Sequence, residues 1–152
     1  MLEGGSRVPL VVNWPGVTPA GRVSSDLIDS SDFFATFAEL AGARLPGDRV
    51  IDGRSFAPQL RGAAGTPREW VFVQLARRWY VADRRWKLTE RAELYDLSGA
   101  PWVETPVPSD RTDPDARAAR TRLQAALAQL NPAGGFIDDG DGTGRHLNRK
   151  KK

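Results

Sequence analysis

The sequence predicts an α/β fold that is incomplete within these residues, so that the chain by itself would be classed as α+β. Three observations support this prediction: a continuous apolar run over residues 8–13, two segments with hydrophobic residues at helical spacing, and a central stretch that alternates with a period of two. A continuous apolar run is typical of a strand buried on both faces, whereas alternation is typical of a half-exposed antiparallel strand. The expected order is strand, helix, antiparallel meander and closing helix.

The first predicted domain, residues 1–65, contains the strand and a helix. The strand, Val8–Asn13, lies between Gly4-Gly5 and the turn signal Trp14-Pro15-Gly16. A helix is expected over residues 31–41, because capping residue types precede it, Gly42 follows it, and the residues between them form an apolar stripe. We interpret this stripe as core and not as a ligand site; it consists of Phe33, Phe34, Phe37, Leu40 and Ala41. A short helical turn is expected over residues 55–61.

The second predicted domain, residues 66–131, contains an antiparallel sheet and a helix. Short strands are expected from Glu69 to Leu75 and then at 79–82, 86–89 and 93–97, because their connections have hairpin length. The proline-rich residues 98–113 are expected to form a surface connection. Asp113 followed by Pro114 predicts a helix start, and one face of this helix is apolar: Ala116, Ala119, Leu123, Ala126, Leu127 and Leu130. Residues 132–152 are expected to be a disordered Gly/Asp-rich and basic tail.

Composition and charge exclude several classes of function. With 152 residues, 40% of them hydrophobic and 27% charged, the chain can be one packed domain or a piece of one. The net charge is +3 and residues 149–152 are all basic, so we do not expect a nucleic-acid partner. The absence of cysteine excludes disulfides, thiolate metal sites and cysteine nucleophiles. No apolar run has the length of a membrane span and residues 1–5 lack signal-peptide character, so we expect no membrane partner and no export signal here.

Several short motifs follow one another along residues 3–130. They are EGGSRVP at 3–9, NWPG at 13–16, SSD at 30–32 with ELAG at 39–42, DGRS at 52–55, LRG at 60–62, REW at 68–70, RWKL at 85–88, ELYDL at 93–97 and ET at 104–105. Their order resembles that in type I, formylglycine-dependent sulfatases, which belong to the alkaline-phosphatase-like superfamily. The resemblance implies that the chain holds the last strand and helix of that α/β domain, followed by a small antiparallel subdomain with a packed C-terminal helix.

The resemblance also implies sulfuric ester hydrolysis by the parent enzyme, with formylglycine as the nucleophile and calcium as the metal. Such a reaction needs a strong nucleophile, a cation and an acid for the leaving group. This chain has no thiol precursor, and its single histidine, His146, lies in the predicted tail. We therefore expect a C-terminal sulfatase portion with no catalytic, cofactor or metal residues, inactive alone. Its expected partner is a separate N-terminal half or a second copy. Sulfatases of this type are commonly exported, but the location of the parent is unknown.

Four residues are candidates for the edge of the sulfate pocket, because in the family the EGG turn lies beside it. They are Glu3, Gly4, Gly5 and Arg7. The alternative interpretation is that Arg7 forms an ion pair that fixes the turn. In either case Gly4-Gly5 fits a backbone position that needs positive φ or close approach, which is a structural role.

An alternative function is a stand-alone module that binds anionic polymers. Five arginines, at positions 77, 78, 84, 85 and 91, interleave with Trp79, Tyr80 and Trp86, as on a stacking platform for single strands. Strand alternation favours a simpler arrangement, in which the aromatic rings point inward and the arginines face solvent or pair with the acids Glu90, Glu93 and Asp96. Residues 138–144 resemble the start of a calcium loop, but Lys150 stands where such a loop needs a glutamate.

Overall fold

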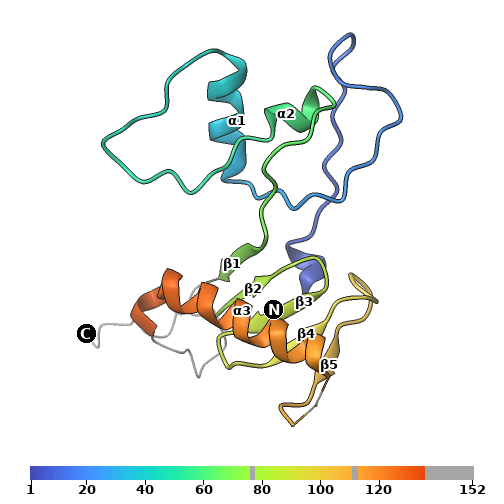
Figure 1. Ribbon diagram of the computed structural model, residues 1–152, viewed down its shortest axis with the longest axis vertical. Helices are drawn as coiled ribbons and strands as arrows, with labels where there is room; N and C mark the ends of the chain where they lie inside the picture. Colours follow the sequence, from blue (N-terminus) through green and yellow to red (C-terminus); the bar gives the residue numbers. More distant parts are fainter. Residues whose placement is uncertain (76–77, 111–112, 136–152) are drawn as a thin grey trace, which may run out of the picture. The chain divides into compact units, whose positions relative to one another are not determined.

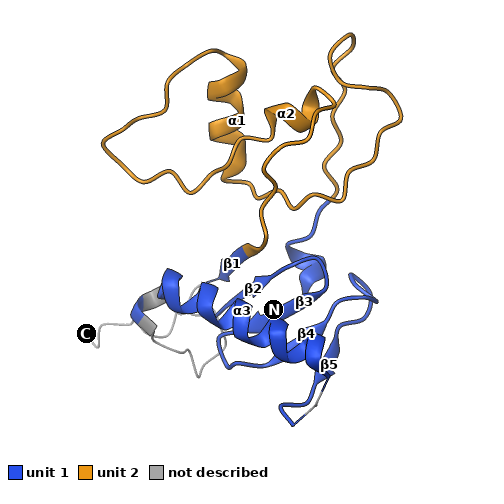
Figure 2. Ribbon diagram, viewed as in Figure 1, with its two compact units in different colours: residues 1–8, 72–152 blue, residues 9–71 orange. Residues whose placement is uncertain are grey.

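The computed structural model describes residues 1–75, 78–110 and 113–135 and divides the chain into two compact units. One unit, here called the sheet unit, combines residues 1–8 with the chain from residue 72 onward (Figure 2). The other, here called the helical unit, comprises residues 9–71. The predicted domain boundaries after residues 65 and 131 stay a prediction. No helix within the described ranges has the length and apolar character required to cross a bilayer.

The sheet unit contains the predicted antiparallel meander, extended by one strand. Its five strands follow one another across the sheet in sequence order (Figure 1), and they are β1 (Val71–Leu75), β2 (Arg78–Ala82), β3 (Trp86–Thr89), β4 (Leu94–Asp96) and β5 (Thr105–Val107). Strand β5 lies where the sequence predicted only a surface connection. Its Pro106 is opposite Tyr95, and an edge strand tolerates proline because one side of it needs no backbone donor.

One face of the sheet carries the core of this unit. Val81 is opposite Leu88, Leu88 is opposite Leu94, and Leu94 is opposite Val107. Side chains of directly opposite residues share a face, and all four of these side chains are buried. Apolar side chains therefore form a continuous row across strands β2 to β5.

Helix α3 (Pro114–Leu130) packs on β2 and β3 (Figure 1). It begins where the sequence predicted, since the Asp113 side chain accepts a hydrogen bond of 3.0 Å from the backbone N–H of Asp115. The apolar face is buried at four positions, Ala116, Ala119, Leu123 and Ala126, whereas Leu130 at its end is exposed. A 3₁₀ turn, Pro132–Gly135, continues the chain. The rest of the predicted tail, 136–152, lies outside the described residues.

The helical unit contains α1 (Asp32–Leu40) and α2 (Ala57–Leu60), which pack against each other and confirm two predicted elements. The Thr36 hydroxyl donates to the Asp32 carbonyl oxygen at 2.7 Å and accepts from the backbone N–H of Phe56 at 3.0 Å. The rings of Phe33 and Phe56 meet edge to face, with centroids 5.4 Å apart. The prediction that the apolar stripe forms core was largely wrong: Phe33 and Leu40 are half-buried, whereas Phe34, Phe37 and Ala41 are exposed. The buried side of α1 carries Asp32, Ala35 and Thr36 instead.

The predicted strand Val8–Asn13 is absent, and this prediction was wrong. The segment has no strand pairing, and Val8 and Val11 are 74% and 86% exposed. A strand exists only where its backbone groups pair with a neighbouring strand. Between residues 9 and 70 the structure has only one isolated bridge, Leu27 with Arg68, so the run has no strand beside it. The apolar residues of this segment predicted a buried strand, but the segment has no neighbouring strand to pair with.

A buried carboxylate, Asp32, connects three of the sequence motifs in the helical unit. It accepts hydrogen bonds from the Arg68 guanidinium, at 2.8 and 3.0 Å from Nε, and from the backbone N–H groups of Arg54 at 2.6 Å and Asp29 at 2.8 Å. Gly53 is needed beside it, because a Cβ there would lie 2.1 Å from the Ser31 carbonyl oxygen. The SSD, DGRS and REW motifs thus meet at one carboxylate.

Candidate functional site

The four candidate pocket-edge residues lie in or next to a short 3₁₀ turn, Glu3–Gly5, in the sheet unit. The turn is closed by the backbone N–H groups of Ser6 and Arg7, which donate to the Glu3 carbonyl oxygen at 2.9 and 2.7 Å. Arg7 also pairs with the Glu3 carboxylate at 3.3 Å, the structural role that the alternative interpretation gave it. The role of these residues at a sulfate pocket stays a prediction.

A buried ion pair on the sheet is hydrogen-bonded to this turn. The Glu104 carboxylate accepts from the Lys87 ammonium and also from the backbone N–H of Glu3. Lys87 additionally donates to the Met1 carbonyl oxygen at 3.1 Å, and the hydroxyls of Ser6 and Tyr80 hydrogen-bond to each other. Lys87 and Glu104 were not candidates in the sequence. The available signal was a lysine inside an otherwise apolar and aromatic strand, which demands a partner when buried.

Two tyrosines complete the surroundings of Lys87. Its Nζ lies 5.2 Å from the ring centre of Tyr80 and 4.8 Å from that of Tyr95, within cation–π range. Burial raises the pKa of both phenols, and nearby carboxylates raise them further. Both hydroxyls therefore stay protonated at neutral pH. A polar pocket of about 110 Å³ opens here, with Met1, Arg78, Glu90 and Glu93 among its lining residues.

The arginine and tryptophan residues of the sheet are arranged as the simpler interpretation predicted. Trp79, Tyr80 and Trp86 are 2–5% exposed. Arg78 pairs with Glu90 at 3.0 Å and Arg85 pairs with Asp96 at 3.3 Å. Arg77 lies outside the described residues. Stacking of bases or sugars needs an open ring face, and these buried rings provide none.

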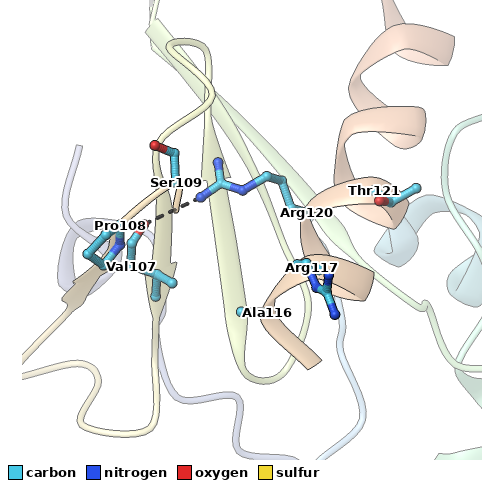
Figure 3. A pocket seen from close by; sticks show the side chains of 7 residues that line it. All are labelled: Val107, Pro108, Ser109, Ala116, Arg117, Arg120 and Thr121. Atoms are coloured by element: carbon cyan, nitrogen blue, oxygen red, sulfur yellow. Dashed lines mark hydrogen bonds between the residues drawn. The ribbon is translucent and has the colours of Figure 1, made fainter. Parts of the chain in front are cut away.

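A second pocket, of about 190 Å³, lies between β5 and α3 (Figure 3). Arg120 reaches across it from the helix and donates to the carbonyl oxygens of Ala92 at 2.6 Å and Val107 at 3.4 Å. The guanidinium therefore satisfies backbone acceptors at the sheet edge. No carboxylate or histidine lines this pocket, which gives it no acid or base for catalysis.

The described ranges contain no group of three His, Cys, Asp or Glu side chains placed to hold a metal ion. Calcium, the metal implied by the resemblance, therefore has no ligand set among these residues, and we assign no step to it. The calcium-loop-like residues 138–144 lie outside the described residues.

Comparison with known families agrees with the order of the motifs. A family model described as N-sulphoglucosamine sulphohydrolase, C-terminal, matches residues 1–131. The chain belongs to this sulfatase C-terminal family. The match includes the turn, the helical unit, the sheet and helix α3. It identifies the chain as the C-terminal portion of a sulfatase of the alkaline-phosphatase-like superfamily.

Curated relatives of this sulfatase domain support the assignment. Human arylsulfatase D is 41% identical over 106 residues, covering 64% of this chain and 18% of the relative. Mouse steryl-sulfatase is 46% identical over 91 residues, covering 56% of this chain and 15% of the relative. Dog N-acetylgalactosamine-6-sulfatase is 48% identical over 67 residues, covering 44% and 13%. The chain thus spans less than a fifth of the length of these relatives.

A solved structure shares the fold of the sulfatase domain. The structure of a 2-O GAG sulfatase superposes with a TM-score of 0.51 and 24% sequence identity, over 66% of this chain and 24% of that chain. The antiparallel sheet with its helices therefore matches the fold class predicted from the sequence.

Proposed function

We propose that this chain is the supporting C-terminal part of a sulfuric ester hydrolase, and that other parts of the enzyme supply the reacting groups. The membership in a sulfatase C-terminal family supports the parent activity. The observation that carries the supporting role is the exposure of large apolar side chains in the helical unit, where Val11, Val23 and Val50 are 86–93% exposed and Phe34 and Phe37 are 55% and 61% exposed.

Exposed side chains of this kind are costly unless another surface covers them. Burial of apolar area is worth roughly 25 cal/mol per Å², and exposed apolar clusters on soluble domains usually mark contact surfaces. Phe34 and Phe37 lie three residues apart on α1 and so share one helix face. The partner we propose for this face is the catalytic part of the sulfatase, because this chain spans only 15–18% of the relatives arylsulfatase D and steryl-sulfatase.

The catalytic part of the parent sulfatase would also hold the groups that react with the sulfate ester. Formylglycine as the nucleophile and calcium as the screening cation would be held by residues of the catalytic part. The residues of this chain would fix the shape of the adjoining domain and the position of the EGG turn.

The proposed contact face predicts a change in dye binding. Phe34→Ser combined with Phe37→Ser should lower the fluorescence of a hydrophobic dye bound to the purified chain, and should lower any self-association measured by analytical ultracentrifugation. Both side chains are more than half exposed, so the thermal unfolding midpoint should change little.

Leu75→Ser is the matched control, because Leu75 is 60% exposed but belongs to the sheet unit. Its effect on dye binding should be clearly smaller. A wild-type chain that is monomeric and binds no dye would contradict the contact face, as would equal effects of the control and the double variant.

A further inference from the structure

We propose that the Lys87–Glu104 ion pair positions the Glu3–Gly5 turn, holding it on the sheet independently of its contribution to sheet stability. Glu104 links Lys87 to the turn directly, since its carboxylate accepts both from Lys87 on β3 and from the backbone N–H of Glu3. The hydrogen bond between the Ser6 and Tyr80 hydroxyls is a separate link between the end of the turn and β2. None of the motifs of the sequence assigns such a role to either residue.

Both members of this ion pair are buried. The side chains of Lys87 and Glu104 are 2% and 6% exposed. Neither charge is stable there without the other, because an unpaired charge in the interior costs several kcal/mol. The Glu104 carboxylate is therefore held beside Lys87 on β3, and one of its oxygens accepts the hydrogen bond from the Glu3 amide.

The loop that carries Glu104 passes close to the same turn. A Cβ placed on Gly4 would come within 3.8 Å of the Pro101 carbonyl oxygen and 3.9 Å of the Pro101 Cβ. The backbone N–H of Val103 donates to the Gly99 carbonyl oxygen at 2.9 Å and closes the loop. The turn therefore lies near a loop whose last residue is paired with Lys87.

The position of the turn has a consequence for the whole enzyme, and this consequence rests on the proposed function. If the EGG turn borders the sulfate pocket there, Lys87 and Glu104 act on that pocket through the turn. They are positioning residues, because in this structure they contact the turn and no reacting group.

The test separates positioning from stability. In the double variant Lys87→Met/Glu104→Leu, apolar residues replace both charges, a change that often leaves stability intact. We expect an unfolding midpoint close to that of the wild type. The amides of Glu3, Ser6 and Arg7 should nevertheless exchange with solvent at least about tenfold faster, because the charged acceptor of the Glu3 amide is gone. NMR-detected hydrogen exchange measures these amides beside those of β3.

The pair Arg78→Met/Glu90→Leu is the control, because it removes another ion pair from the sheet unit, one that has no hydrogen bond to the turn among the residues the structure describes. Its turn amides should exchange as in the wild type. Unchanged turn amides in the Lys87/Glu104 variant, or a Glu3 amide already unprotected in the wild type, would overturn the proposal. If the Lys87/Glu104 variant fails to fold, the protection of the Glu3 amide in the wild type still tests the proposal. None of these readouts depends on sulfate hydrolysis, so their failure leaves the proposed function standing.

Discussion

Replacing Asp32 with asparagine is expected to destabilise the helical unit by about 3 kcal/mol, because it leaves a largely buried arginine without its counter-charge. The Asp32 and Arg68 side chains are 3% and 11% exposed. The loss should appear as a hundredfold or greater rise in amide exchange across α1 (Asp32–Leu40). Helix α3, in the sheet unit, should keep its protection. Hydrogen exchange with mass spectrometry resolves the two helices.

The same carboxylate gives this unit a pH dependence of known sign. Burial by itself would raise the pKa of Asp32, but hydrogen bonds from Arg68 and from the backbone N–H groups of Arg54 and Asp29 outweigh it, so the pKa is lowered. Its stabilisation is therefore complete above the unfolded-state pKa of about 3.9 and is lost as the pH falls below that value. The Asp32→Asn variant should lack this loss.

Asp48→Asn is the matched control, since Asp48 also pairs with an arginine, at 2.9 Å, but both side chains are at least 65% exposed. Exposed pairs contribute little, and no measurable change in α1 exchange is expected. Equal protection of α1 in the wild type and in Asp32→Asn at pH 7 would show that the carboxylate does not hold the unit together.

Replacing Leu123 with alanine is expected to cost about 2–5 kcal/mol of the stability of the sheet unit. Leu123 is fully buried on the face of α3 that packs on β2 and β3. The shortened side chain leaves a cavity between helix and sheet, and a packed interior closes such a cavity only in part. Urea unfolding followed by tryptophan fluorescence measures the loss, because Trp79 and Trp86 are buried in this unit.

Leu130→Ala on the same helix provides the comparison. Leu130 is 39% exposed, and alanine has the higher helix propensity, so its midpoint should stay close to that of the wild type. If both leucine variants lost stability equally, α3 would not pack through the face that the structure shows.

Local signals were sufficient where an element is stabilised by neighbours in the same chain. Asp113 followed by Pro114 predicted the start of α3, alternation predicted β1, and short aromatic-rich segments with hairpin-length connections predicted β2 and β3. They failed where the partner or the constraint is distant. The apolar run at residues 8–13 predicted a strand that has nothing to pair with. The prolines of residues 98–113 predicted a surface connection in place of β5, although an edge strand such as β5 tolerates Pro106.

Of the candidate site, only the contacts within residues 3–7 were predictable from the sequence. The EGG motif predicted a turn and an ion pair of Arg7, and the structure contains both. The prediction that its glycines need positive φ or close approach was wrong, because neither has a positive φ and an added Cβ would meet nothing closer than 3.8 Å. The sheet residues that bond to this region are distant in sequence: Lys87 and Glu104 bond to the backbone of Met1 and Glu3, and Tyr80 bonds to Ser6. Motif spacing cannot predict these contacts, because the register of the sheet and the path of the loop before β5 bring the residues together.

An assay of aryl sulfate hydrolysis by the purified chain, with and without added calcium, tests the central claim most directly. The described residues contain no metal-binding cluster, and the sequence has no cysteine and one histidine. We predict no turnover above the uncatalysed rate in either condition. Hydrolysis at an enzymatic rate by this chain alone would contradict the account, because the reacting groups would then lie within it.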